Sequence, residues 1–435
     1  MLERWIGFGV FIGAFLQVQA MPAISHWKTN NGADVYFSAL HSAPLLNVIV
    51  QFKAGSVFDG DHPGLASVAG GLIGTGTQAL TEREIDNRSD TTGALFDTEV
   101  TKLSTRLSLQ TLTEVPHMHQ ALTLFHQGFA RFKLYPGKLD RIKKEMRVTI
   151  KNAHDNPSKQ MQEAIFRALY PGLPLAHPVT GTIASVKAIS SDDVLSFYRH
   201  YYTANNATVI LVGDVSREKA KKIANALTVG LPSGDVQYPE MTVTPKKPIQ
   251  ITVMRDNLAQ SYIALTTLTA KADSPTNDAL QIANDILGGG FNSKLTDVIR
   301  KQHGLAYVAN SQLVTLLGDA PFIAVMQAKA GKRAEAIKLA NQTIKTFVDQ
   351  PIAESEISVA KQSLIGGTLL KYLSNAQYAN RLASLVASGL PANYDSTYAA
   401  RINAVTQKTI ENAAKQYLSP QKLNTIIVGK AKDRA

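Results

Sequence analysis

The chain has 435 residues, of which 45% are hydrophobic and 18% are charged. This length exceeds what one ordinary hydrophobic core needs and indicates two or more globular domains, while the composition argues against disorder except at the ends. The sequence contains no cysteine, which excludes disulfides, thiolate zinc sites, a cysteine nucleophile and a lipid-modified cysteine.

The basic excess does not indicate nucleic-acid binding. There are 45 basic and 34 acidic side chains, which give a formal net charge of +11. The basic residues are spread along the chain and form no run flanked by aromatic residues. We therefore expect a solvated surface or a weak attraction for acidic peptides, and no nucleic-acid partner.

The first 20 residues have the pattern of a signal peptide. Arg4 precedes an apolar run from Trp5 to Leu16, and Val18-Gln19-Ala20 offers small or modest residues where a signal peptidase cleaves. The apolar run is shorter than the roughly 20 residues that span a bilayer, and no later segment approaches that length. We expect an exported chain without stable membrane insertion; an uncleaved N-terminal anchor is the alternative.

Two segments far apart in the sequence are similar to each other. Ser190–Val215 and Thr406–Ala431 each predict a capped helix followed by an apolar strand that closes on a glycine. These glycines, Gly213 and Gly429, are 429 − 213 = 216 positions apart. The similarity predicts a tandem duplication.

The starts of the two halves agree with this offset. Leu65 and Leu280 each open an apolar helix after a predicted strand, and they are 280 − 65 = 215 positions apart. Between the halves, residues 231–248 contain four prolines, which neither a helix nor a central strand tolerates well. The predicted organisation is a signal peptide (1–20), an N-terminal domain (21–230), a linker (231–248) and a C-terminal domain (249–435).

Each half mixes alternating strands with amphipathic helices. The predicted strands are Val48–Lys53, Val100–Leu109, Tyr262–Leu268 and Ala320–Ala328, and the predicted helices include His117–Phe132 and Lys332–Phe347. The predicted fold class is therefore α+β. It consists of two homologous tandem domains, each a largely antiparallel sheet packed with helices, which face each other across a chamber that can hold a ligand.

Several short motifs resemble the pitrilysin/insulinase family of zinc peptidases. In the second half they lie within Leu287–Tyr307. In the first half they are Asp155-Asn156-Pro157, Tyr170, His177-Pro178, Gly181-Thr182, Ile189-Ser190, Phe197-Tyr198, Tyr201-Tyr202, Asn206-Ala207 and Val212-Gly213-Asp214. The motifs are spread over both halves, so the resemblance covers the whole mature chain.

The resemblance implies a metal motif at a defined place, and this chain lacks it. Active members carry H-x-x-E-H on the first long helix, which puts two histidines and a catalytic glutamate on one helical face. Here the matching positions are Ser67, Gly70 and Gly71. Glycine has no ligating side chain and a serine hydroxyl is a poor zinc ligand. Glu145 stands where the third ligand is implied, and one carboxylate cannot hold zinc alone.

The second half keeps a different part of the family pattern. Arg300 and Tyr307 stand seven positions apart in a segment that begins with Gly288-Gly289-Gly290. The resemblance implies that this pair faces a zinc site across the chamber, where Tyr307 donates to the oxyanion and Arg300 holds a substrate carbonyl or reinforces that charge. Without the resemblance, Arg300 is a solvated helix residue and Tyr307 a strand aromatic.

Other constellations give weaker signals. His117, His119 and His126 share a predicted helix but have no acidic residue in ligand spacing, so we interpret them as surface histidines. The run Gly71–Gly76 imitates a dinucleotide loop without its strand-turn-helix context. The sequence contains neither G-x-S-x-G nor a P-loop motif.

These observations lead to one expected function and two alternatives. The resemblance implies the non-metal subunit of a heteromeric zinc peptidase, inactive alone, which binds peptide and supplies Arg300 and Tyr307 to the zinc site of a homologous partner in a Gram-negative periplasm. No cofactor is expected on this chain itself, and zinc is expected on the partner. The alternatives are an inert structural or peptide-binding pseudo-peptidase and a basic surface-binding protein. Homodimerisation of the isolated chain stays open.

Overall fold

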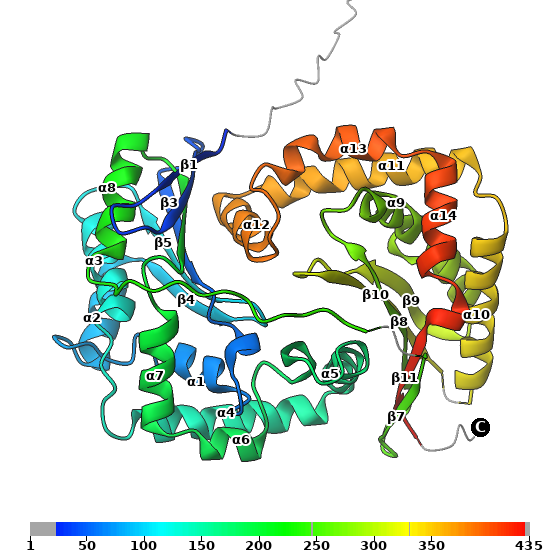
Figure 1. Ribbon diagram of the computed structural model, residues 1–435, viewed down its shortest axis with the longest axis horizontal. Coiled ribbons are helices and arrows are strands. Elements are labelled where there is room, and N and C mark those ends of the chain that lie inside the picture. The colour runs from blue at the N-terminus through cyan, green and yellow to red at the C-terminus, as the bar shows by residue number, and fades with distance from the viewer. Residues whose placement is uncertain (1–22, 245–246, 330, 431–435) are drawn as a thin grey trace, which may run out of the picture.

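The computed structural model describes residues 23–244, 247–329 and 331–430, so the predicted signal peptide lies outside the described residues. Figure 1 shows two sheets, one in each half, surrounded by helices. The predicted α+β class and two-domain fold are confirmed.

The first sheet has six strands in the order β1-β2-β6-β3-β5-β4. Only the β2–β6 pair is parallel. The strands are β1 (Ser25–Lys28), β2 (Asp34–Ala39), β3 (Leu45–Phe52), β4 (Leu95–Val100), β5 (Thr105–Leu112) and β6 (Ala207–Gly213).

One predicted strand is wrong. Val100–Leu109 is not continuous, because β4 ends at Val100 and β5 begins at Thr105. The turn between them is closed by the Thr101 N–H, which donates to the Ser104 carbonyl at 2.8 Å, while the Thr101 hydroxyl accepts from two backbone N–H groups of the turn. A threonine hydroxyl that satisfies turn donors in this way competes with the strand ladder.

The second sheet has five strands in the order β7-β11-β8-β10-β9, again with one parallel pair, β7–β11. The order β7-β11-β8-β10-β9 repeats the order β2-β6-β3-β5-β4 of the first sheet strand for strand. The duplication predicted from the sequence therefore appears in the topology. β4 lies at an edge of the first sheet, beside β5, and β9 lies at an edge of the second sheet, beside β10. The strands are β7 (Gln250–Met254), β8 (Ser261–Lys271), β9 (Ala306–Leu313), β10 (Asp319–Ala328) and β11 (Asn424–Gly429).

Helices cover both faces of the sheets. In the first half they are α1 (Leu65–Leu72), α2 (Glu82–Thr92), α3 (His117–Ala130), α4 (Lys138–Asp155), α5 (Pro157–Leu169), α6 (Ile183–Ala188), α7 (Ser191–Tyr201) and α8 (Arg217–Thr228). In the second half they are α9 (Pro275–Asn284), α10 (Arg333–Asp349), α11 (Glu354–Leu369), α12 (Asn375–Ala387), α13 (Tyr398–Ala404) and α14 (Gln407–Tyr417), together with the π-helices η3 (Asp285–Gly289) and η4 (Thr296–Gln302).

One helix of each half packs against the sheet of the other half. Helix α12 packs Leu382 and Tyr378 against Ile49 and Ile210 on the first sheet, whereas α5 packs Ile165 and its neighbours against the second sheet. Strand residues alternate between the two faces, so the opposite face of each sheet packs on its own helices. Figure 1 shows α5 and α12 lying between the two sheets. They join the halves and border the space between them.

The chain between α8 and β7 crosses from one half to the other. Within its described residues, 229–244 and 247–249, it forms neither helix nor strand. Tyr238 ties it to the first half, since its hydroxyl donates to the Leu103 carbonyl at 3.2 Å. The domain boundaries at 230 and 249 stay predictions. Among the described residues no helix has the length and apolar character that crossing a membrane requires.

Candidate functional site

Helix α1, which carries the altered metal motif, is packed rather than open. The Ser67 hydroxyl donates to the Val179 carbonyl at 2.7 Å, so it is already used in a structural hydrogen bond. Gly70 is buried against the end of β4, where an added Cβ would come within 2.5 Å of Val100 Cγ2. A carboxylate side chain has no space at Gly70 in this arrangement.

The remaining two positions of the motif give no metal site either. Gly71 packs beside α4, with Ile142 Cγ2 at 3.2 Å from the position of an added Cβ. Glu145 lies one turn further along α4; it is exposed and forms an ion pair with Arg141 at 3.3 Å. Within residues 23–244, 247–329 and 331–430, no three His, Asp or Glu side chains gather as metal ligands do. The residues at the motif therefore do not fit a zinc ion.

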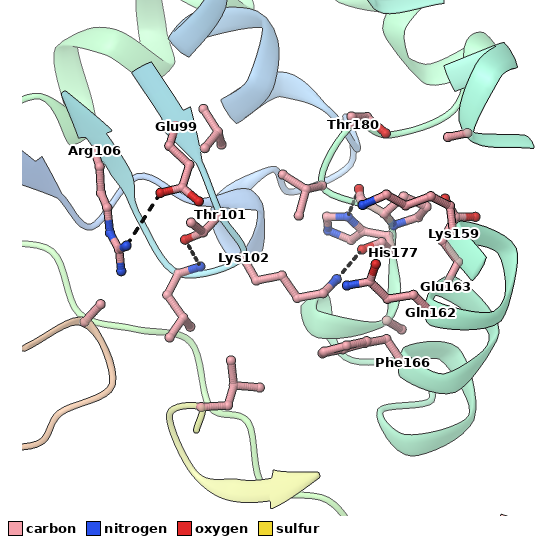
Figure 2. A pocket seen from close by; sticks show the side chains of 18 of the residues that line it. Glu99, Thr101, Lys102, Arg106, Lys159, Gln162, Glu163, Phe166, His177 and Thr180 are labelled. Carbon is pink, nitrogen blue, oxygen red and sulfur yellow. Dashed lines mark hydrogen bonds and ion pairs between the residues drawn. The ribbon is translucent and has the colours of Figure 1, made fainter. Parts of the chain in front are cut away.

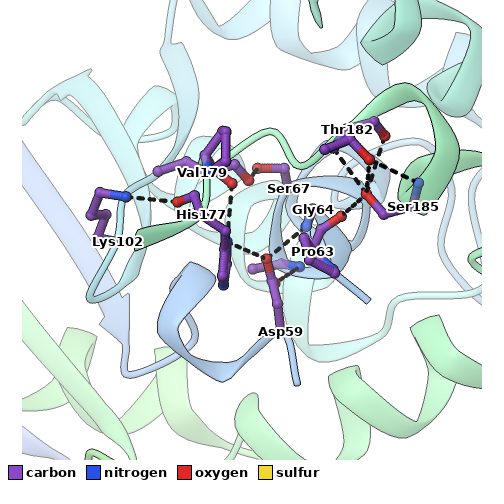
Figure 3. Close-up of polar contacts among 11 residues, drawn as sticks. Asp59, Pro63, Gly64, Ser67, Lys102, His177, Val179, Thr182 and Ser185 are labelled. Atoms are coloured by element: carbon purple, nitrogen blue, oxygen red, sulfur yellow. Dashed lines mark hydrogen bonds and ion pairs between the residues drawn. The ribbon is translucent and has the colours of Figure 1, made fainter. Parts of the chain in front are cut away.

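An aspartate that the sequence analysis did not single out holds the start of α1. The Asp59 carboxylate accepts the backbone N–H groups of Gly64 at 2.6 Å and Ala66 at 2.7 Å. Figure 3 shows it between the start of α1 and His177, whose Nδ1 lies 3.9 Å from Asp59 Oδ2. Burial raises the pKa of Asp59 to about 7, against the opposing effect of the two backbone donors.

Lys102 extends this network into a cavity. Its Nζ donates to the His177 carbonyl at 2.8 Å and lies 4.6 Å from the centre of the Phe166 ring. Burial lowers the pKa of Lys102 to about 8 and also lowers the pKa of His177. The β4–β5 turn, the 176–180 loop and α5 thus meet around one half-buried ammonium group.

The cavity beside Lys102 lies between the two halves and has a volume of about 610 Å³, in the range of small-molecule sites. Figure 2 shows Lys102 reaching from the β4–β5 turn toward α5. The second half contributes the loop after β9 and the C-terminal end of α12. The lining residues include Glu99, Val100, Lys102, Arg106, Lys159, Glu163, Phe166, His177, Thr315, Leu316 and Ser384.

Among the charged residues that line the cavity, Arg106 forms an ion pair and Glu163 has no ion-pair partner among the described residues. Arg106 pairs with Glu99 at 3.5 Å, donates to Gln51 at 2.8 Å and reaches Ser384 of α12 at 3.3 Å, so it also links the halves. Glu163 on α5 is half-buried, and burial raises its pKa. Clefts with groups whose pKa is shifted by burial are frequent functional sites.

Arg300 and Tyr307 lie in the second half, in two consecutive elements. Arg300 is exposed in the last turn of η4, and Tyr307 is 54% exposed on the edge strand β9. The Lys329 ammonium lies 5.6 Å from the centre of the Tyr307 ring. Within the described part of the chain, the Tyr307 hydroxyl and the Arg300 guanidinium have no hydrogen-bond or ion-pair partner, and neither residue lines the cavity beside Lys102. Their catalytic role stays a prediction.

The glycine-rich sequence before this pair has a packing role. Gly288, in η3, lies against Ser311 of β9, where any Cβ would clash with the Ser311 backbone and hydroxyl. The same hydroxyl donates to Asn284 Oδ1 at 2.8 Å. Gly304 turns the chain from η4 into β9 with φ +60°, which glycine adopts without strain. Small residues here fix the position of β9 and hence of Tyr307.

Of the three histidines on α3, His119 is exposed and His117 is half-buried. His126 is half-buried, and its Nε2 lies 2.8 Å from the Val229 carbonyl, so it acts as a structural donor. The sequence analysis missed Asp59, Lys102 and Glu163. None of the three had a local signal, because Asp59 reaches the start of α1 from five residues before the N-cap Gly64 and not from the N-cap position itself.

Known families and proteins match nearly the whole chain. The family described as Insulinase (Peptidase family M16) matches residues 35–183, and the one described as Peptidase M16 inactive domain matches residues 188–364. A Helicobacter pylori protein named "Non-peptidase homolog YmxG" is 23% identical over 436 residues, which are 98% of each chain. An uncharacterized zinc protease of Rickettsia bellii is 25% identical and covers 84% of this chain and 86% of its own.

Solved structures give the same relationship. The peptidase M16 inactive domain from Pseudomonas fluorescens has a TM-score of 0.87 and 25% identity over 95% of this chain and 99% of its own. A protease from Helicobacter pylori has a TM-score of 0.85 at 19% identity, covering 94% of this chain and 100% of its own, and shows the fold alone. The matches together span both halves. The chain belongs to the insulinase (M16) peptidase family, as an inactive-type member.

Proposed function

We propose that this chain is the non-metal subunit of a two-chain zinc peptidase, in which a homologous partner holds the zinc. In this arrangement the chain binds part of the peptide and supplies Arg300 and Tyr307 to the partner's site. The observation that carries the proposal is the asymmetry between the halves. Gly70 and Gly71 leave no metal ligands on a tightly packed helix, whereas Arg300 is exposed in η4 and Tyr307 is exposed on the edge strand β9.

The chemistry of the pair suits this role. A phenol O–H and a guanidinium are both donors, and preorganised donors stabilise the oxyanion that forms when water attacks a peptide carbonyl. The Tyr307 side chain makes no hydrogen bond within the described residues, so its hydroxyl is available to a substrate. This chain's own residues can hold and orient a peptide and stabilise negative charge, but they cannot activate a zinc-bound water.

The shape of the first half supports peptide binding. Strand β4 is an edge strand with a largely exposed surface, including Leu95 at 66% exposure, and its end lines the cavity beside Lys102. An unpaired edge offers backbone donors and acceptors to an extended peptide, which adds as a further strand. The relatives named "non-peptidase homolog" and "inactive domain" support a chain without activity of its own.

The test is hydrolysis of an unstructured peptide with added zinc, by this chain alone, by a zinc-bearing homologue from the same organism alone, and by the mixture. We expect only the mixture to cleave. Cleavage by this chain alone would contradict the account of Ser67, Gly70 and Gly71. If the partner alone cleaves as fast as the mixture, the shared-site proposal is wrong.

An inert peptide-binding pseudo-peptidase is the second candidate. It is favoured by one observation, that Arg300 and Tyr307 do not line the cavity beside Lys102. It predicts that the mixture cleaves no faster than the partner alone, while peptide still binds to this chain.

We also propose export to a Gram-negative periplasm, which rests on the N-terminal sequence pattern. Fractionation of cells and N-terminal sequencing of the purified chain test it, with a new N-terminus after Ala20 expected.

A further inference from the structure

Helix α11, which lies beside α13 in the second half (Figure 1), has apolar residues on two opposite faces. Its inner face packs Ile357 and Ala360 into the core of the second half. Its outer face presents Val359, which is 66% exposed, and the chain continues to Leu370 and Leu373, which are 62% and 73% exposed. A helix at the surface of a single folded chain needs only one apolar face. Within the described residues, nothing covers the second apolar face of α11.

The residues of this outer face lie in one row. Val359, Gln362, Gly366 and Leu370 are spaced by three, four and four positions, which places them on one side of a helix over about 16 Å. We call these four residues the α11 row. All four are exposed. Exposed apolar side chains that are continuous in this way, rather than scattered singly, mark a contact with another molecule.

The α11 row also lacks charge. In residues 358–370, all of which the structure describes, no exposed residue is charged. Lys361 is the one charged residue of this stretch, and its Nζ donates to the carbonyls of Asn403 and Val405, at the end of α13. Because the chain has a formal net charge of +11, two copies repel each other on average. The α11 row is a surface where two copies can meet without that repulsion.

Gly366 leaves a gap in the row. A Cβ built at Gly366 or at Gly367 would meet no atom within 4 Å, so the fold of the single chain does not require glycine there. Glycine in a helix interior is less favourable than alanine, and nothing within the described chain offsets that cost. Val359 protrudes from the same face, seven positions before Gly366. A row with a protruding side chain on one side of its centre and a gap on the other is complementary to itself in the antiparallel orientation.

We propose that the α11 row pairs two copies of this chain, with the two α11 helices antiparallel across a two-fold axis between Gln362 and Ser363. Val359 of each copy then packs over Gly366 of the other, because the two positions lie at equal distances from the axis along the helix. One two-fold axis thus forms the same contact twice. The row is smaller than the roughly 800 Å² per partner of a standard interface, so the dimer is reversible. The inference does not depend on the proposed function, which concerns η4 and β9.

The first test uses the absence of cysteine from the chain. Gln362→Cys introduces a single thiol close to the two-fold axis, where facing helices bring the two Cα atoms within reach of a disulfide. After oxidation we expect this variant to run as a covalent dimer on a non-reducing gel. Gln416→Cys, at an exposed position on α14, is the matched control and should stay monomeric. No dimer with Gln362→Cys, or equal dimer with both variants, overturns the inference.

Sedimentation velocity measures the association of the native chain at concentrations from about 1 to about 100 μM. We expect a shift from monomer to dimer within this range. Val359→Glu should raise the dissociation constant at least about tenfold, because it buries a charge in the contact. Val229→Glu, after α8, replaces an apolar side chain that is 56% exposed and should dimerise like the native chain. Equal effects of the two substitutions would contradict the α11 contact.

Gly366→Leu distinguishes the proposed geometry from general stickiness. The substitution adds apolar surface but fills the gap that Val359 of the other copy occupies, so we expect weaker association. The position is open in the single chain, so the variant should fold, and a thermal melt checks this. Association stronger than that of the native chain would show a nonspecific apolar patch and would contradict the antiparallel pairing.

The inference and the proposed function fail separately. A native chain that stays monomeric up to about 100 μM overturns the α11 pairing. If Val359→Glu then weakens association with the zinc-bearing homologue, the row belongs to that partner instead of a second copy. Hydrolysis by the mixture tests Arg300 and Tyr307 and does not require the pairing. A monomeric Val359→Glu variant that still supports hydrolysis at the native rate is the result expected if both are correct.

Discussion

Helix α1 in the first half and the η4–β9 segment in the second half use their residues in opposite ways. In α1 the implied ligand positions are Ser67, Gly70 and Gly71. Val100 and Ile142 fill the space beside the two glycines, and the Ser67 hydroxyl donates to the Val179 carbonyl. In η4–β9, Arg300 and Tyr307 remain exposed. The first region is part of the packing, and the second presents polar groups that packing does not use. Substitutions in α1 should therefore change stability, and substitutions in η4–β9 should change the rate of the mixed peptidase.

The largest expected effect is that of Tyr307→Phe. Removing one oxyanion donor costs about 3 kcal/mol, so the mixture should cleave roughly 100-fold more slowly. The melting temperature should stay the same, because Tyr307 is 54% exposed. Initial rates with saturating partner and a thermal melt measure the two quantities. Tyr417→Phe on α14 is the control, and an equal loss of rate there would remove the special role of Tyr307.

Arg300→Ala should have the next largest effect. A hydrogen bond to a charged group contributes about 1.5–3 kcal/mol, so we expect a loss of roughly 10-fold or more in kcat/KM of the mixture. Lys301→Ala is the matched control, because Lys301 is exposed and its Nζ donates to Asn292 at 2.9 Å. If both substitutions reduce the rate equally, the effect comes from general surface charge rather than from a positioned guanidinium.

The sequence predicted the fold well because its signals were local or repeated. The duplicated pattern of capped helix and closing strand gave two equivalent halves, and the Ser190–Asp193 capping box is present in the structure. The strand Val100–Leu109 was wrong because alternation continues across a turn whose signal is a single threonine. The exchange of α5 and α12 between the halves had no sequence signal, since both helices simply have one apolar face.

The candidate site was only partly predictable. The expected loss of the metal motif follows from the residue types at Ser67, Gly70 and Gly71 and stays a prediction, and the close packing of the two glycines is consistent with it. The cavity beside Lys102 was not predicted, because it forms only where α5 crosses toward the second sheet and brings Glu163 opposite the β4–β5 turn. Long-range packing of this kind leaves no periodic pattern in the sequence.

Asp59, which holds the start of α1, should make the stability of the chain depend on pH. The pKa of Asp59 is about 7 in the folded protein and 3.8 in the reference state. A carboxyl group whose pKa is raised on folding contributes stability that is fully present below the lower value and lost as pH rises through the higher one. We expect the native chain to lose about 4 kcal/mol from this group between pH 4 and 8.

Asp59→Asn isolates that contribution. Asparagine keeps the shape and one acceptor but does not titrate, so the difference in unfolding free energy between the native chain and the variant should shrink or reverse as pH rises. His177 works in the opposite direction, because burial lowers its pKa. Because His177 Nδ1 lies 3.9 Å from Asp59 Oδ2, the difference between the two proteins reports the titration of both groups. Urea unfolding at pH 4, 6 and 8 measures it, and a constant difference would show that the Asp59 carboxyl is ionised throughout.

The smallest expected effect compares two glycines inside helices. Gly366 in α11 has open space around the position of a Cβ, so Gly366→Ala should stabilise the chain by about 0.5–1 kcal/mol through the higher helix propensity of alanine. At Gly70 the same Cβ would come within 2.5 Å of Val100 Cγ2. Gly70→Ala should therefore destabilise by about 1–2 kcal/mol despite the same gain in propensity.

A double-mutant cycle identifies the cause of this loss. If the clash with Val100 is responsible, Val100→Ala should be less harmful in the Gly70→Ala background than in the native chain, because it removes the methyl group that the new Cβ meets. Urea unfolding of the four proteins gives the coupling energy. Zero coupling, or stabilisation by Gly70→Ala equal to that by Gly366→Ala, would mean that α1 still has room for a side chain. The loss of zinc binding would then depend only on residue type, and restoring the ligands at Ser67, Gly70 and Gly71 would meet no obstacle from packing.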